Sequence, residues 1–289
     1  MVGRGEITDK AWERIAPLLP ENGGRRGGQW QDHRKVVNGI LWKLRTGAPW
    51  RDLPSRYGPW QTCYDRFVRW RRDGTWDRLL AHAQTKSDAV GEVEWEVSVD
   101  SSVVRAHQHA SGARRKPESE RRKKGLSHPE DEGLGYSRGG LSTKLHLSCD
   151  GKGRPLSVVV TPGQRNESTQ LEAVLDGIRV MRPGRGRPRK RPDRLIADRG
   201  YSHDSCRKLL RKRGIRHTIP ERTDQKERRA RRGGRPPSFD AELYKRRNVV
   251  ERCVNRLKQW RGVATRYEKR AANYRAAVVI AALMIWLAS

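Results

Sequence analysis

The chain has 289 residues, with 63 Lys and Arg against 33 Asp and Glu, which gives a net charge of +30 at neutral pH. Such a charge repels itself unless a polyanion neutralises it, so nucleic acid is the favoured partner. A membrane surface is the competing partner, but an apolar span needs about 20 residues, and the longest apolar run, 276–288, is shorter and predicts a buried C-terminal helix.

The first 90 residues carry the pattern of short helices. Apolar residues recur at helical spacing within 7–20, 32–47, 60–74 and 76–84. Gly47 supplies a stop signal for the second helix, and turns rich in Gly and Pro separate the others. Short helices joined by tight turns predict an all-α DNA-binding domain of the helix-turn-helix type over residues 1–90.

The helix expected at 60–74 is the candidate DNA-reading helix. Its apolar residues fall on one side, and arginines that include Arg66 and Arg69 supply positive charge. Gln61 and Thr62 lie near its N-terminus, where side chains of a recognition helix contact bases. The alternative is a basic helix of a bundle whose charges are only solvated.

From residue 94 the periodicity changes from helical to alternating. Trp95, Val97 and Val99 fall on one face of a strand whose other face carries Asp100. Two strands follow at 143–150 and 155–160, joined by a hairpin signal. After them the pattern indicates a helix at 167–181, a strand at 194–198, a helix at 203–214, a strand at 215–220 and then the last helices. This order predicts a mixed α/β layer fold over residues 91–289.

Two basic segments lack either periodicity. Residues 111–140 are charged and rich in Gly, which predicts a flexible insertion. Residues 182–194 include Arg185 and Arg187 in an Arg-Gly-Arg-Pro sequence that resembles an AT-hook, a segment that can lie in an A/T minor groove. A basic loop on backbone phosphates is the favoured alternative.

The four cysteines are far apart and form no Cys-x-x-Cys pair. This spacing disfavours zinc and a disulfide framework, so we expect small buried hydrophobic residues in a reducing intracellular compartment.

Three carboxylates are the candidates for catalysis. Asp100 lies on the polar face of its strand, Asp198 ends the apolar run of another strand, and Glu251 lies on a helix near the C-terminus. Carboxylates that converge in this way are costly without cations, and paired Mg²⁺ ions would remove that cost. Two such ions can clamp the attacking and leaving oxygens of a phosphodiester.

The stretch from Tyr244 to Lys258 places Glu251 among basic residues. On a single continuous helix, Tyr244, Arg247, Glu251 and Lys258 fall within an arc of roughly 60°. The alternative is an ordinary charged row on a helix surface.

The spacing Tyr-x2-Arg-x3-Glu-x6-Lys resembles the signature around the last acidic residue of the bacterial DDE transposases of the IS4/IS5 kind. SVDSS around Asp100 and LIADRGY around Asp198 look like the first and second acidic motifs of that family. GAPWRDLP and PWQTCYDRF are similar to its N-terminal segment. The resemblance covers nearly the whole chain and points to an IS5-family insertion-sequence transposase.

The resemblance implies an RNase H-like catalytic core in which Asp100, Asp198 and Glu251 hold two Mg²⁺ ions, with Mn²⁺ as a substitute. Tyr244, Arg247 and Lys258 would hold phosphates beside the break. The partners would be the double-stranded terminal inverted repeats and target DNA, bound by a homodimer or a larger assembly in the bacterial cytoplasm, in association with the nucleoid. A domesticated DNA-binding regulator and another RNase H-like nuclease are the alternatives.

Overall fold

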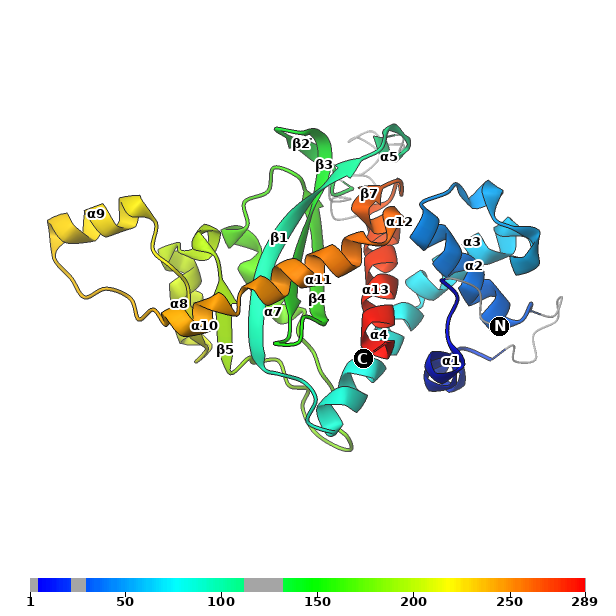
Figure 1. Ribbon diagram of the computed structural model, residues 1–289, viewed down its shortest axis with the longest axis horizontal. Coiled ribbons are helices and arrows are strands. Elements are labelled where there is room, and N and C mark those ends of the chain that lie inside the picture. The colour runs from blue at the N-terminus through cyan, green and yellow to red at the C-terminus, as the bar shows by residue number, and fades with distance from the viewer. Residues whose placement is uncertain (1–4, 22–29, 112–131, 289) are drawn as a thin grey trace, which may run out of the picture.

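The computed structural model describes residues 5–21, 30–111 and 132–288. Figure 1 shows the first helices at one end of the molecule, a sheet in the middle and the helix α9 at the far end. The prediction of an N-terminal helical region followed by a mixed α/β region is confirmed.

The N-terminal region consists of four helices with short 3₁₀ turns between them. They are α1 (Asp9–Ile15), α2 (His33–Thr46), α3 (Trp60–Arg72) and α4 (Thr75–Ala89), with η1 (Ala16–Leu18), η2 (Trp50–Asp52) and η3 (Ser55–Tyr57). The hydroxyl of Thr8 caps α1 by accepting a hydrogen bond from the Ala11 amide. Gly47 ends α2 in the left-handed conformation, at φ 71°, as its sequence position predicts.

Among the described residues, seven strands form one sheet, which lies beside these helices in Figure 1. They are β1 (Glu96–Ala106), β2 (Gly135–Ser137), β3 (Gly140–Cys149), β4 (Pro155–Pro162), β5 (Arg194–Ala197), β6 (Arg216–Thr218) and β7 (Thr265–Arg266). The five principal strands follow the order β4-β3-β1-β5-β6. β3 is antiparallel to its neighbours β1 and β4, whereas β5 and β6 run parallel to β1. This mixed sheet, with β1 at its centre, fits the RNase H-like core that the sequence predicts.

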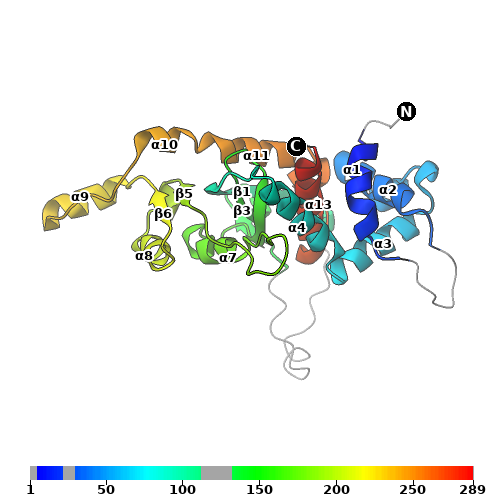
Figure 2. The same ribbon diagram turned by 90° about the horizontal axis from the view of Figure 1, so that it is seen from below.

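Helices cover both faces of the sheet. The helices and 3₁₀ turns after β1 are α5 (Gln108–Ser111), η4 (Ser168–Gln170), α7 (Leu171–Asp176), η5 (Arg199–Tyr201), α8 (Asp204–Lys212), α9 (Thr223–Arg232), α10 (Ala241–Lys245), α11 (Asn248–Lys258), α12 (Arg261–Ala264) and α13 (Ala271–Leu287). In Figure 2, α10 and α11 lie on one side of the strands and α7 and α8 on the other. α13, the predicted buried C-terminal helix, is enclosed between the sheet and α4.

A buried ion pair joins the N-terminal helices to the C-terminal end of the chain. Lys43 of α2 contacts Glu268, and both side chains are at least nine-tenths buried. Next to this pair, Gly262 approaches α2 so closely that an added Cβ would lie 3.1 Å from the Leu44 carbonyl oxygen. The N-terminal helices are therefore packed directly on α12 and α13.

The turn between β3 and β4 is also fixed by a buried ion pair. The Asp150 carboxylate accepts hydrogen bonds from the Arg154 side chain at 2.7 and 2.9 Å and from the Arg154 amide at 2.8 Å. The Arg154 guanidinium lies 4.1 Å from the ring centroid of Trp286 in α13. The hairpin predicted from this sequence is thus confirmed, and a cation–π contact holds it to the last helix.

Two sequence-based expectations require correction. The helix predicted at 167–181 is shorter, because a 3₁₀ turn precedes α7 and the helix ends at Asp176. The C-terminal part of the predicted insertion forms β2, which pairs with β3, whereas residues 112–131 of the insertion lie outside the described residues.

The expected burial of all four cysteines is confirmed, and each is a free thiol. Within the described ranges, no helix combines the length and the apolarity that crossing a membrane requires.

His146 on β3 makes the stability of this fold depend on pH. Its side chain is fully buried, and its Nε2 lies 2.8 Å from the Thr161 hydroxyl. Burial, with the nearby charge of Lys144, lowers the pKa of His146 to about 4. The pKa in the unfolded chain is about 6.5, so the contribution to stability is complete above that pH and is lost as the pH falls toward 4.

Between pH 7 and pH 4 the free energy of unfolding should fall in both wild type and His146→Gln. We expect the fall to be about 3 kcal/mol larger in wild type, because only wild type carries the buried histidine. Urea unfolding at pH 7, 5.5 and 4 measures the difference between the two proteins. Parallel pH profiles would show that His146 does not titrate in this way.

Candidate active site

Two of the three candidate carboxylates lie on neighbouring strands at the centre of the sheet. In the parallel pairing of β1 with β5, Val99 lies opposite Ala197, so Asp100 and Asp198 follow in adjacent positions. The Asp100 carboxylate accepts a hydrogen bond from the Ser101 amide at 2.8 Å. Asp198 accepts one from the Gly200 amide at 2.9 Å and thereby caps η5.

Arg247 connects this pair to Glu251, the third candidate. Its guanidinium donates to Glu251 at 2.6 Å and to Asp100 at 3.2 Å. The side chains of Asp100 and Arg247 are only 16% and 18% exposed, whereas that of Glu251 is 53% exposed. The structure therefore brings Asp100, Asp198, Arg247 and Glu251 into one cluster, with Glu251 at its solvent side.

The single helix expected from Tyr244 to Lys258 is wrong. α10 ends at Lys245 and α11 begins at Asn248, and the junction consists of tight turns in which the Arg247 amide donates to the Tyr244 carbonyl. Tyr244 lies before the junction, where its ring packs 5.3 Å from that of Phe239. Lys258 shares α11 with Glu251, seven residues and roughly 10 Å further along the axis, and burial lowers its pKa.

Burial makes the ionised carboxylates of β1 and β5 costly. It raises the pKa of Asp100 to about 6, although the Ser101 hydrogen bond and the charge of Arg247 oppose the shift. Burial also raises the pKa of Asp198, and the charge of Glu167 adds to that effect. Shifts of this kind, caused by burial and a neighbouring like charge, are typical of functional sites.

Glu167 is a further carboxylate at this site that the sequence analysis did not identify. A Cβ on Gly200 would lie 2.6 Å from Glu167 Oε2 and 3.0 Å from Asp198 Oδ1, so both carboxylates converge on this glycine. Lys144 Nζ lies 3.4 Å from the other Glu167 oxygen. The adjacent Asn166 accepts hydrogen bonds from the amide and hydroxyl of Ser168, which is a local turn contact.

The chemistry of these side chains fits a divalent metal ion. Carboxylate oxygens are the ligands that Mg²⁺ and Mn²⁺ prefer, and a cation would offset the cost of ionising Asp100 and Asp198. In the described part of the chain, no three acidic, histidine or cysteine side chains already lie at metal-binding separation. Because Arg247 holds Glu251, that side chain would have to rotate before all three carboxylates could share ions.

The candidate DNA-contacting residues of α3 divide into exposed and buried ones. Gln61 and Arg69 are exposed and Thr62 is half-buried. Arg66 is only 5% exposed, because its guanidinium lies 3.9 Å from the Trp30 ring centroid and 2.8 Å from His33 Nδ1. The structure thus gives Arg66 a packing role and does not present it to DNA, contrary to the expectation.

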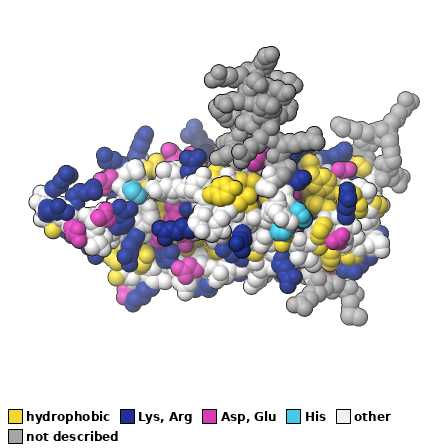
Figure 3. All heavy atoms as spheres, turned by 90° about the horizontal axis from the view of Figure 1, so that it is seen from above, with side chains coloured by type: hydrophobic (Ala, Val, Ile, Leu, Met, Phe, Trp, Pro, Cys, Tyr) yellow, Lys and Arg dark blue, Asp and Glu magenta, His cyan; other side chains and the backbone are white. Residues whose placement is uncertain are grey.

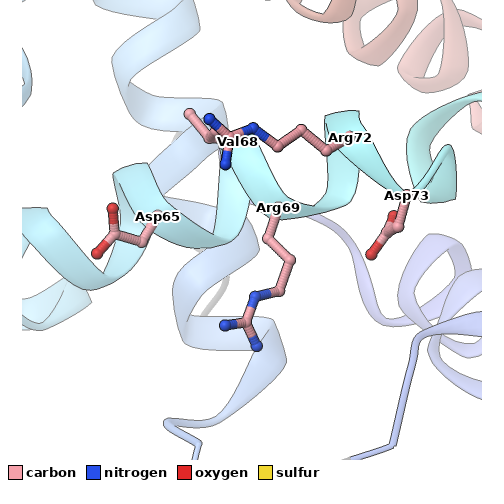
Figure 4. Close-up of a pocket in the computed structure, with 5 residues that line it drawn as sticks. All are labelled: Asp65, Val68, Arg69, Arg72 and Asp73. Carbon is pink, nitrogen blue, oxygen red and sulfur yellow. The ribbon is translucent and has the colours of Figure 1, made fainter.

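Arg69 lines a hollow of about 460 Å³ on the surface of α3. Figure 4 shows its side chain projecting away from the helix, whereas that of Arg72 runs back along the helix toward Val68. Arg185 and Arg187, the residues of the AT-hook-like sequence, are exposed on the loop that the Val180–Arg189 bridge closes.

Comparison with known proteins assigns the family. Residues 92–287 match the family described as "Transposase DDE domain", and residues 7–80 match "Putative transposase of IS4/5 family". The chain belongs to the DDE transposases. It is therefore a metal-dependent enzyme that cleaves DNA, and the resemblance noted in the sequence is confirmed.

Curated proteins similar to this chain include a transposase and an uncharacterized protein. The chain is 30% identical over 147 residues to "Putative transposase for insertion sequence element IS6501" of Brucella ovis. This alignment covers 51% of this chain and 99% of that protein. It is 40% identical over 111 residues to "Uncharacterized protein y4sN" of Sinorhizobium fredii, covering 38% of this chain and 83% of that protein. Among solved structures, the Mos1 mariner paired end complex with Mn aligns with 87% of this chain and 86% of that one, at 10% identity and a TM-score of 0.23.

The contacts of Asp100 predict opposite pKa changes in two variants. We expect Arg247→Met to raise the pKa of Asp100 above about 6, because the guanidinium favours the ionised carboxylate. We expect Asp198→Asn to lower it, because a neighbouring negative charge is removed. Carboxyl-carbon NMR titration of metal-free protein labelled at Asp measures both, and shifts of the same sign in the two variants would contradict this electrostatic picture.

Proposed function

We propose that the chain binds the ends of an insertion sequence, hydrolyses phosphodiester bonds there with two metal ions and joins the freed 3′-hydroxyl ends to target DNA. The main support is the cluster of Asp100, Asp198, Arg247 and Glu251 at the centre of an RNase H-like sheet, in a chain of the DDE transposase family. In this proposal, residues 91–289 are the catalytic domain and residues 1–90 bind DNA.

Asp100, Asp198 and Glu251 would hold the two ions, Mg²⁺ or Mn²⁺ in its place. When bound, these ions activate water and stabilise the charge that develops on the phosphodiester. Glu251, half-exposed on α11, is the ligand that can turn toward the β1 and β5 carboxylates without unfolding the helix.

Arg247 has a second role in this mechanism. Once Glu251 turns away, the Arg247 guanidinium loses its shortest ion pair. It would then lie beside the reacting phosphate, which it can bind through two parallel hydrogen bonds. Lys258 lies further along the same face of α11 and would contact the next phosphates, and Tyr244 would do so from the end of α10.

Basic surfaces remote from the cluster support binding of double-stranded DNA. α9 has no buried residue, and Figures 1 and 2 show it standing away from the body of the protein. Figure 3 shows Lys and Arg side chains at many places on one face, among acidic, apolar and other side chains, and several of them at the α9 end. Gln61, Thr62 and Arg69 on α3 and the loop of Arg185 and Arg187 would add contacts.

A basic hollow of about 720 Å³ between α8, β6 and the segment before α10 also fits a backbone phosphate. Its lining includes Arg207, Arg211 and Arg216, together with the Thr218 and Ser238 hydroxyls. Arg207 is buried, yet its Nη1 has no hydrogen-bond partner among the described residues. The arginines give the hollow a positive charge that a phosphate would complement, although the Asp240 carboxylate also lines it.

Two DNA ends must be brought together with a target for strand joining, so we expect a homodimer or a larger assembly at work on DNA. The expected setting is the bacterial cytoplasm, in association with the nucleoid. A domesticated regulator would not need the intact Asp100, Asp198 and Glu251.

Glu251→Gln tests the proposed chemistry. We expect Mg²⁺-dependent cleavage of a labelled element end to fall by at least about 100-fold, because an anionic ligand is lost, while end binding in a gel-shift assay stays unchanged. Glu242→Gln is the matched control, since Glu242 lies on α10 and pairs with the exposed Lys245. Cleavage at the wild-type rate by Glu251→Gln would reject the assignment.

Point variants on α3 test the DNA-binding role of the N-terminal helices better than their deletion, because deletion would expose the face of α13 that α4 covers. We expect Arg69→Ala to weaken end binding several-fold and to reduce the salt dependence by about one phosphate contact. Arg275→Ala is the control, since Arg275 is half-exposed and pairs with Asp77. Equal affinities and salt slopes for wild type and Arg69→Ala would place recognition elsewhere.

A further inference from the structure

Glu167 lies at the active site without belonging to the acidic triad of the proposed mechanism. It sits in the loop between β4 and α7, and its carboxylate reaches Gly200, which lies just after β5. Glu167 Oε2 and Asp198 Oδ1 both lie next to the space that a side chain at position 200 would fill, and which is free because residue 200 is glycine. The other Glu167 oxygen faces Lys144 at 3.4 Å, a separation that gives only a weak contact.

A neighbouring hydroxyl independently indicates a missing ligand at this place. The Tyr201 side chain is fully buried, and its hydroxyl has no hydrogen-bond partner among the described residues. Tyr201 directly follows Gly200 in η5, and its amide donates a hydrogen bond to the Asp198 carbonyl at 3.2 Å, so Tyr201 belongs to the same turn as these two residues. A buried donor without a partner is costly, and a metal-bound water or a carboxylate turned inward by an ion would satisfy it.

The charge balance of the site favours the same conclusion. Three carboxylates leave one positive charge on a pair of divalent ions, whereas four balance them. With four carboxylates committed to ions, Arg247 and Lys144 would both lose their carboxylate partners and become available to DNA phosphates.

We propose that Glu167 is a fourth carboxylate of the metal site, which joins Asp198 in holding a divalent ion, and that Lys144 restrains it until the ion binds. This inference rests on the proposed two-metal function and names one more residue for it. The competing explanation is that Glu167 and Lys144 form only a structural ion pair that fixes the loop before α7.

Mn²⁺ binding to the full-length protein without DNA tests the proposal by a measurement other than activity. Isothermal titration calorimetry and the Mn²⁺ EPR signal give the affinity and the number of bound ions. We expect Glu167→Gln to weaken Mn²⁺ binding by about 10-fold or more, or to remove one bound ion. Glu172→Gln is the matched control, because Glu172 lies on α7 and pairs with Arg213 away from the cluster.

Lys144→Met separates the two explanations. If Lys144 restrains Glu167, this variant binds Mn²⁺ at least as tightly as wild type, and the rise in melting temperature that Mn²⁺ causes is retained. In Glu167→Gln that rise is reduced. If the pair is only structural, both variants lower the melting temperature in EDTA and neither changes Mn²⁺ affinity, which would overturn the proposal.

Asp100→Asn distinguishes failure of this inference from failure of the proposed function. If Asp100→Asn abolishes Mn²⁺ binding while Glu167→Gln binds as wild type does, the role of Glu167 is rejected and the two-metal function stands. If wild-type protein binds no Mn²⁺ with or without element-end DNA, both are rejected.

Discussion

The contact of Arg247 with Asp100 and Glu251 is the interaction on which the geometry of the candidate active site depends. It crosses from the central strand β1 to α11, two elements separated by about 150 residues in the sequence. Asp100 is mostly buried, and an unpaired buried carboxylate would be costly, so the arginine compensates its charge in the metal-free protein. The same guanidinium holds Glu251 near Asp100, in the middle of β1. One side chain therefore stabilises the metal-free cluster and, in the proposed mechanism, fixes the position from which Glu251 would move.

The rigidity of the connection between the two regions has a similar origin. Lys43 and Glu268 form a buried pair between α2 and the segment before α13, and breaking such a pair leaves an uncompensated buried charge. α4 packs along α13, which in turn lies against β4. As a result, α3, the candidate recognition helix, has a defined orientation toward the cluster instead of hanging on a linker.

Much of the fold could be predicted from the sequence because its signals are local. The alternation around Asp100 indicates a strand, the apolar run before Asp198 indicates a strand end, and Gly47 marks the end of α2 by its own conformation. Glu167 has no such signal, because it lies in an irregular loop and reaches the Asp198 turn only through the tertiary fold. Arg66 looked like its exposed neighbours, and its burial depends on Trp30, which lies far from it in the sequence.

The break between α10 and α11 places two consecutive arginines on different parts of β1. Arg246 pairs with Glu94 and Glu96 at the start of the strand, while Arg247 pairs with Asp100 further along it. Under the proposed mechanism, the first attachment can persist when the second is released, so α11 would keep its place if Arg247 exchanged a carboxylate for a phosphate. Thermodynamic linkage would then require that DNA which draws Arg247 away strengthens the binding of metal ions to Glu251, and that the ions strengthen the binding of DNA by the same factor. In such a site, positive cooperativity between cofactor and substrate would follow from the sharing of one guanidinium, and the metal-free protein would stay in a closed ionic state until DNA arrived.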